Sequence, residues 1–161
     1  MSQYKFKISH KPNIFYGNYT ERLEDWQAIR NIVNEVDNPI DILVNIFQHC
    51  PRTKTNTDIY KKSTWLTGWQ LVERNEYDIF DISLLVSYTV LLTDNFKDTN
   101  VKIHTVYKKE YSSNNHKFNY IIEMMNCYID AYSMAKLSKS EFDKHYVLQY
   151  TTHIQKPINT E

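Results

Sequence analysis

Hydrophobic residues recur at intervals of three and four along much of the chain, which is the spacing of one face of an α-helix. The pattern predicts helices over about 20–36, 39–50 and 65–72. Acids in the first turn of the first segment and a proline at the start of the second support these helix starts. Gly68 weakens the third prediction, because glycine within a helix costs about 1 kcal/mol relative to alanine.

Residues 79–92 form the longest apolar stretch and are interrupted by Asp81. A bilayer needs about 20 apolar residues, so the stretch is too short to span a membrane. As a strand it would extend for roughly 46 Å, whereas a helix of the same length covers about 21 Å and fits a domain with a radius of gyration of about 15 Å. Asp78 and Asp81 fit the N-cap and N3 positions of a helix. We predict a buried central helix, with a bent or bulged strand as the alternative.

The remaining segments predict two strands and two further helices. Residues 4–8 alternate and residues 101–107 are rich in β-branched side chains, so both should be strands. Residues 118–132 have the clearest helical spacing of apolar side chains, and residues 138–141 match a capping box that precedes another helix. The tail, about 150–161, is expected to fray.

These elements predict a mostly α fold of the α+β class. We expect a single domain over residues 1–161, helical around the apolar central helix, with a small antiparallel sheet. Glycine scarcity supports the helical interpretation, because the chain contains 2 glycines and an average chain of this length carries about 11. Hairpin turns favour glycine or Asn-Gly, and no glycine follows Gly68.

Composition and charge indicate the cellular compartment and the source genome of the protein more than its function. The 19 basic and 19 acidic residues give no net charge, so no global attraction to nucleic acid or membrane is expected. The N-terminal segment has lysines without the apolar core of a signal peptide. Cys50 and Cys127 are expected to be buried free thiols, with one disulfide as the alternative. We therefore expect a cytoplasmic protein. The composition also indicates the kind of genome, because glycine is scarce while Asn, Lys, Ile and Tyr are abundant. This bias is typical of an AT-rich genome, such as that of a phage, virus, plasmid or low-GC bacterium.

Several catalytic classes lack the residues that they need. Gly17 and Gly68 cannot assemble a glycine-rich phosphate loop, which argues against Rossmann and P-loop enzymes. The sequence contains no HExxH, CxxC or EF-hand pattern, and the adjacent His49 and Cys50 would point to different sides of a helix. We predict no cofactor.

Paired acids leave one enzymatic alternative. Three carboxylate pairs at i,i+3 spacing could each lie on one helix face, as magnesium binding between helices requires. ERLE at 21–24 is similar to the first such pair of the all-α nucleotide pyrophosphohydrolases, which implies a magnesium-dependent nucleotide hydrolase. The second pair lies about 50 residues downstream and no lysine accompanies it, so solvated first-turn acids are the simpler interpretation. The candidate ligands are Glu21, Glu24, Glu73, Glu76, Asp78 and Asp81.

Basic charge collects in three segments, 1–12, 51–64 and 100–120, each with a net charge of +3, and the segments between them are acidic. Aromatic residues accompany the lysines. Lysines beside stacking rings are typical of single-stranded nucleic-acid grooves, tyrosine-rich surfaces are equally typical of protein interfaces, and ordinary polar loops are the third interpretation. The candidate binding residues are Tyr60, Lys61, Lys62, Tyr107, Lys108, Lys109, Tyr111 and Lys117.

The sequence thus predicts a non-enzymatic accessory protein of a phage, virus or mobile element. We expect it to bind and to modulate or inhibit a host macromolecule, with a host protein as the favoured target. The alternatives are a nucleic-acid-binding module that uses the basic aromatic segments and a magnesium-dependent all-α nucleotide hydrolase. The residues do not indicate an oligomeric state.

Overall fold

The computed structural model describes residues 12–54, 57–74, 76–110 and 117–157. Its helices are α2 (Tyr19–Glu35), α3 (Ile40–Phe47), the short 3-10 helix η1 (Lys62–Thr64), α4 (Gly68–Glu73), α5 (Ile79–Leu91) and α6 (Lys139–His145). Its strands are β1 (Val101–Lys108), β2 (Asn119–Met124), β3 (Cys127–Asp130), β4 (Ala135–Leu137) and β5 (Tyr146–Ile154).

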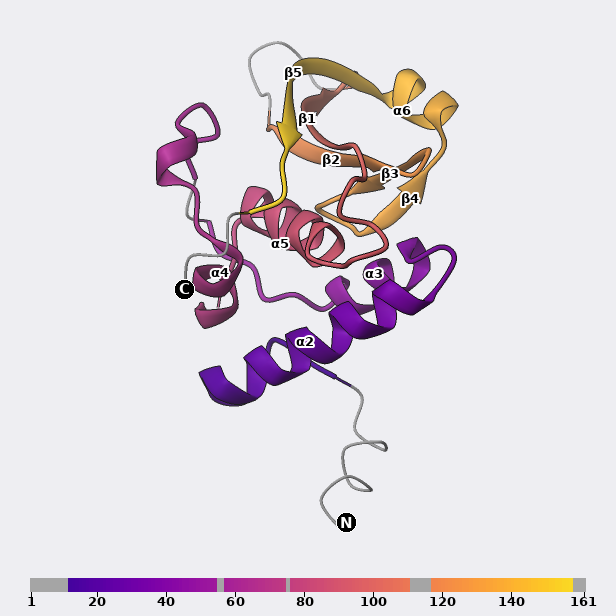
Figure 1. Cartoon of the computed structure of the whole chain (residues 1–161). Helices are drawn as coiled ribbons and strands as arrows, with labels where there is room; N and C mark the ends of the chain where they lie inside the picture. Colours follow the sequence, from indigo (N-terminus) through magenta and orange to yellow (C-terminus); the bar gives the residue numbers. More distant parts are fainter. Residues whose placement is uncertain (1–11, 55–56, 75, 111–116, 158–161) are drawn as a thin grey trace, which may run out of the picture.

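The strands form one antiparallel sheet in the order β4-β3-β2-β1-β5. Helix α5 packs against β2 on one face of the sheet, and α2 and α4 pack on the side of α5 that is turned away from the sheet (Figure 1). Helix α6 lies at the opposite face, where it contacts β3, β4 and β5. The order is therefore outer helices, central helix, sheet and α6.

The prediction of a central helix is confirmed. Asp78 is the N-cap of α5 and its side chain accepts a hydrogen bond from the backbone N–H of Asp81. All residues of α5 after Ile79 are buried, because the helix has the outer helices on one side and the sheet on the other. Within the described residues, no helix is both long and apolar enough for a bilayer crossing.

The prediction of a mostly helical domain with a small antiparallel sheet is wrong. The protein is an α+β fold in which the five-stranded sheet is a substantial part. Only the strand at 101–107 was expected within this sheet, and it forms β1, the strand between β2 and β5. The predicted strand at 4–8 lies outside the described residues.

Residues 118–132 account for most of the error, because they form the hairpin β2–β3 and not a helix. Both faces of the sheet are covered, so the neighbouring residues Ile121 and Ile122 are both buried, on opposite faces. A strand buried on both faces loses the alternation that identifies strands in a sequence. Its apolar residues can then recur at intervals of three and four without forming a helix.

The helix that follows the predicted capping box is short. Ser138 caps α6 as expected, with its side chain accepting from the N–H of Glu141, but the helix ends at His145. Tyr146 begins β5, which pairs along β1 as far as Ile154. Residues 150–154, which were expected to fray, thus form the second half of an edge strand.

The two cysteines are free thiols: Cys50 is buried and Cys127 is partly buried. The main core lies between the outer helices, α5 and the sheet, and includes Trp26, Phe47 and Leu85. A smaller core beneath α6 consists of Val106, Ile121, Tyr128, Phe142 and Tyr146.

Candidate functional site

A cleft of about 970 Å³ opens where the N-terminus of α5 meets the chain between α3 and α4 and one end of the sheet. We refer to it as the aromatic cleft. Both polar and apolar side chains line it: Arg52, Thr53, Lys54, Thr57, Asp58, Ile59, Tyr60, Asp78, Ile79, Phe80, Thr105, Lys117, Phe118, Tyr120 and Tyr132.

Three large rings of the cleft are exposed to solvent. The exposed fractions of Tyr60, Phe118 and Tyr132 are 70%, 53% and 60%. Phe118 directly precedes β2 and Tyr132 follows β3 by two residues, so the antiparallel pairing of the hairpin brings both rings to the same end of the sheet. Tyr60 comes from a distant part of the chain, and its ring lies 5.2 Å from the ring of Tyr150 in β5.

Phe80 and Tyr120 line the floor of the cleft in edge contact with each other, and Phe80 also contacts the Trp65 ring. Phe80 of α5 is buried, and its ring centre lies 5.1 Å from Trp65 and 5.3 Å from Tyr120. Burial raises the pKa of the Tyr120 phenol to about 12, and the nearby Asp78 and Tyr60 add to the effect. Tyr120 therefore keeps its proton at neutral pH.

Cations stand beside the exposed rings. The Cζ atom of Arg52 lies 5.0 Å from the centre of the Tyr132 ring, within the range of a cation–π interaction. Lys54 and Lys117 are exposed and also line the cleft. The cleft thus combines three cations with three exposed rings.

Backbone pairing fixes the position of the chain that carries Arg52. The N–H of Tyr77 donates to the carbonyl of Pro51 at 3.1 Å, and the N–H of Thr53 donates to the carbonyl of Tyr77 at 2.9 Å. This is an isolated parallel bridge that joins Arg52 to Tyr77, next to the N-cap of α5.

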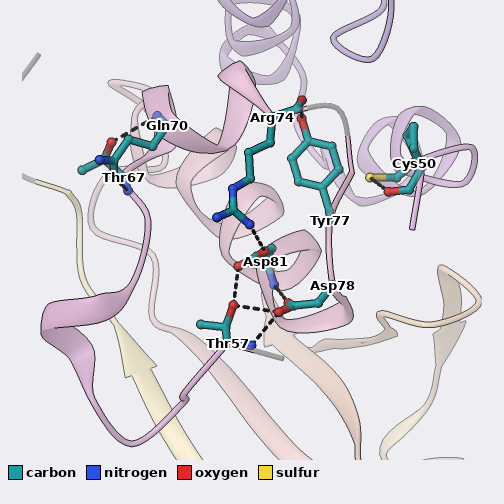
Figure 2. A network of polar contacts seen from close by, with 9 residues as sticks. Cys50, Thr57, Thr67, Gln70, Arg74, Tyr77, Asp78 and Asp81 are labelled. Atoms are coloured by element: carbon teal, nitrogen blue, oxygen red, sulfur yellow. Dashed lines mark hydrogen bonds and ion pairs between the residues drawn. The ribbon is translucent and has the colours of Figure 1, made fainter. Parts of the chain in front are cut away.

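A carboxyl pair at the start of α5 holds the same chain from a second point, and Figure 2 shows its contacts. Asp78 Oδ2 accepts from the backbone N–H and the hydroxyl of Thr57, both at 2.7 Å, and the Thr57 hydroxyl lies 2.9 Å from Asp81 Oδ1. One hydroxyl has one proton to donate. Both contacts are therefore full two-centre hydrogen bonds at the same time only when one of the two carboxyls is protonated and donates to the Thr57 oxygen.

Asp81 is the carboxyl that the surroundings favour in the neutral form. Burial raises its pKa, and the neighbouring Asp78 raises it further, while the contacts with Thr57 and Arg74 oppose the change. Its side chain is fully buried, and Arg74 Nη1 lies 3.7 Å from Asp81 Oδ2, with the Arg74 side chain 45% exposed. Asp78, by contrast, accepts three hydrogen bonds, the third from the N–H of Asp81.

The structure brings together only part of the predicted binding set. Tyr60 and Lys117 line the aromatic cleft. Lys61 and Lys62 follow Tyr60 and are exposed, and Lys62 lies over the Trp65 ring at 5.8 Å. Lys108 and Lys109 line a separate hollow of about 490 Å³ with Lys144, His145 and Tyr146. Tyr107 is partly buried in β1, and Tyr111 lies outside the described residues.

The candidate magnesium ligands do not gather into one site. Asp78 and Asp81 adjoin, but Glu21 is in the first turn of α2, where its side chain accepts from Asn18, and Glu24, Glu73 and Glu76 are exposed. In the part of the chain that the structure describes, no group of three or more His, Cys, Asp or Glu side chains could hold a metal ion.

Four of the six residues that supply the exposed rings and the cations of the cleft were absent from the predicted set. Arg52 and Lys54 belong to the basic segment that the charge pattern identified, so that signal could have included them. Phe118 and Tyr132 were assigned to one helix, where 14 residues would have separated them by about four turns. Recognition of a hairpin would have placed them side by side.

Comparisons with protein-family models, with curated proteins and with solved structures find no match to this chain. The fold and the cleft define the class of protein: an α+β protein with an open cleft that is lined by exposed aromatic rings, three cations and two acids.

Proposed function

We propose that this chain is a non-enzymatic accessory protein of a phage, virus or mobile element that binds a host protein through the aromatic cleft. The observation that carries the proposal is the gathering of Tyr60, Phe118 and Tyr132 at one cleft although each is more than half exposed. Exposed aromatic side chains that cluster together mark interaction sites more often than rings that are scattered singly.

The composition of the cleft favours a protein partner. Tyrosine, phenylalanine and arginine are enriched at protein interfaces, and tyrosine and arginine are among the residues that contribute most of the binding energy. The lining contains three cations and the two acids Asp58 and Asp78, so its charge is close to balanced. The whole chain also has no net charge, whereas nucleic-acid-binding domains typically carry a strong excess of basic residues.

Single-stranded nucleic acid is the second candidate, because the cleft places Lys54 and Lys117 beside the exposed rings. Rings that stack on bases and lysines that neutralise phosphates are the parts of such a groove. We also infer that the protein acts in the host cytoplasm, and the two free thiols support this inference.

A comparison of capture from host lysate tests the proposal. The tagged chain, the cleft variant Tyr60→Ser/Phe118→Ser and the control variant Tyr16→Ser/Ile32→Ser are each used, with and without nuclease. The control is matched, because Tyr16 is 71% exposed and Ile32 40% exposed, and neither lines the cleft. We expect the wild type and the control to retain one protein after nuclease treatment, and the cleft variant to lose at least 90% of it (about 1.4 kcal/mol).

Two results would contradict the proposal. Retention of the same protein by the cleft variant would place the binding surface elsewhere. If the wild type no longer captures the host protein after nuclease treatment, nucleic-acid binding would replace protein binding as the function.

A further inference from the structure

We propose that the aromatic cleft recognises an acidic peptide segment that carries a large apolar or aromatic anchor. This inference rests on the proposed function and specifies the chemistry of the partner. It follows from the division of the cleft into an apolar floor and a basic rim.

The floor can bind one large side chain of a partner. Phe80 and Ile59 are buried beneath the opening, and Tyr120 holds the Phe80 ring in edge contact. A ring that enters from a partner would contact this floor and be flanked by the exposed Phe118 and Tyr60. Aromatic anchors that fill such pockets supply most of the free energy of binding at protein interfaces.

The rim has cations that face solvent. Among the described residues, no ion pair joins Arg52, Lys54 or Lys117 to an acid. Arg52 contacts the face of a ring, and that contact leaves its N–H groups at the edge of the guanidinium free to bind a carboxylate. The three charges therefore complement an acidic segment.

The acids of the cleft, in contrast, are engaged with groups of the protein itself. Asp78 is buried and accepts from Thr57 and from the N–H of Asp81, while Asp58 accepts from the N–H of Tyr60 at 3.0 Å. A basic partner would meet three cations and one exposed acid, Asp58, because Asp78 is buried. Charge complementarity thus favours an acidic peptide over a basic one.

The cleft is also preorganised. The bridge between Arg52 and Tyr77 and the contacts of Thr57 fix the chain that carries the rim at two points. Backbone that is held in this way at Arg52 and Thr57 loses little conformational entropy on binding, so moderate contacts with a short segment can give measurable affinity.

Selection from a random 12-residue phage-display peptide library tests the inference. We expect the wild-type chain to enrich peptides with Asp or Glu flanking Trp, Phe or Leu. Fluorescence anisotropy with the most enriched synthetic peptide should then show binding that weakens with added NaCl. The variant Lys54→Glu/Lys117→Glu should bind that peptide with an affinity at least about tenfold lower. In the same selection this variant should enrich basic peptides instead.

Two further variants control the test. Lys97→Glu/Lys139→Glu makes the same change in net charge at exposed positions outside the cleft and should leave the affinity for the peptide unchanged. Tyr60→Ser/Phe118→Ser should abolish the selection. Folding of each variant is checked by its unfolding midpoint in urea.

The outcomes separate this inference from the proposed function. Peptides that depend on the cleft rings but show no acidic preference overturn the acidic assignment and leave a protein-binding cleft. If the selection enriches no peptide that depends on the cleft, the inference is also overturned. The proposed function would still be supported in that case if the wild type, but not Tyr60→Ser/Phe118→Ser, captures a host protein from lysate. Binding of a 20-residue oligothymidylate that is lost in both cleft variants would overturn both.

Discussion

Gly68 occupies the first turn of α4 because no side chain fits between that turn and the ring of Trp26. A Cβ atom at this position would lie 2.5 Å from the tip of the Trp26 ring. The ring cannot move aside easily, since Trp26 is fully buried, donates to Thr89 at 3.0 Å and contacts the Trp69 ring. The glycine that weakened the helix prediction is thus required by packing.

Gly68→Ala is therefore expected to destabilise the protein by about 1–3 kcal/mol, the usual cost of overpacking a core. Helix propensity alone predicts the opposite sign, a gain of at most about 1 kcal/mol, because Gly68 is the first residue of α4 and not an interior one. Urea unfolding followed by circular dichroism measures the difference. Ser140→Ala, at an exposed position in α6, is the control and should change stability by less than about 0.5 kcal/mol. An unchanged or higher midpoint for Gly68→Ala would show that the Trp26 ring yields.

Single residues of the cleft could be proposed from sequence only where a local signal marked them. Tyr60 and Lys117 stood in basic segments that also contain rings, and both line the cleft. The carboxyl pair of Asp78 and Asp81 was expected as a helix start, and that prediction is confirmed. Their contact with Thr57 could not be predicted, because it joins residues more than 20 positions apart.

At the level of secondary structure, the turn of the β2–β3 hairpin explains why the sheet was underestimated. Met124 pairs with Cys127, and the two residues between them both have positive φ, 51° for Met125 and 57° for Asn126. This is the pattern of a type I′ turn, for which Asn-Gly is the usual sequence. Because a methionine stands at the first position, the sequence carries no recognisable hairpin signal there.

Asn126→Gly is expected to raise the free energy of unfolding by up to about 1 kcal/mol, because glycine adopts positive φ without steric cost. Asn126→Val should lower it by about 1–2 kcal/mol, since a β-branched residue is strained in the left-handed region. Asn126 is exposed, so lost packing does not confuse the comparison. Thermal unfolding of both variants measures the effect.

The matching control is Asn31→Gly in the exposed face of α2, which should destabilise by about 0.3–0.5 kcal/mol, because glycine is less favourable than asparagine within a helix. The same substitution is thus expected to have opposite signs in the two elements. Equal midpoints for the glycine and valine variants of Asn126 would argue against a turn with positive φ.

Helices and strands were predictable according to how many of their faces are covered. Helix α2 buries one face, including Trp26, Ile29 and Val33, and its periodicity identified it. Helix α5 is buried on all sides, and its length and N-cap identified it instead. The hairpin β2–β3 gave no such sequence signal. Both of its faces are covered, so its strands do not alternate, and its turn lacks glycine.

At the scale of the whole molecule, the aromatic cleft exists because the layers meet at the start of α5. The first turn of the central helix α5 lies against one end of the sheet. The chain between α3 and α4 passes beside this junction (Figure 1). Residues from five separate parts of the sequence therefore line one cleft. No sequence pattern could show this convergence, because it depends on the order of the layers.

The same junction buries Asp81, and this should make the stability of the whole protein depend on pH. The folded state raises the pKa of Asp81, so it binds the proton more tightly than the unfolded chain does. The stabilisation is therefore complete below the ordinary Asp pKa of about 4 and is lost as the pH rises through the raised value.

Asp81→Asn should remove this dependence, since an amide can donate to the Thr57 hydroxyl as the protonated carboxyl does. Urea unfolding at several pH values from 5 to 8 measures the free energy of unfolding of both proteins. We expect the wild type to lose stability relative to Asp81→Asn as the pH rises, while Asp94→Asn, at an exposed acid, follows the wild type. A difference between wild type and Asp81→Asn that is constant with pH would mean that Asp81 is charged throughout. In that case Arg74, 3.7 Å away, would outweigh burial and the charge of Asp78.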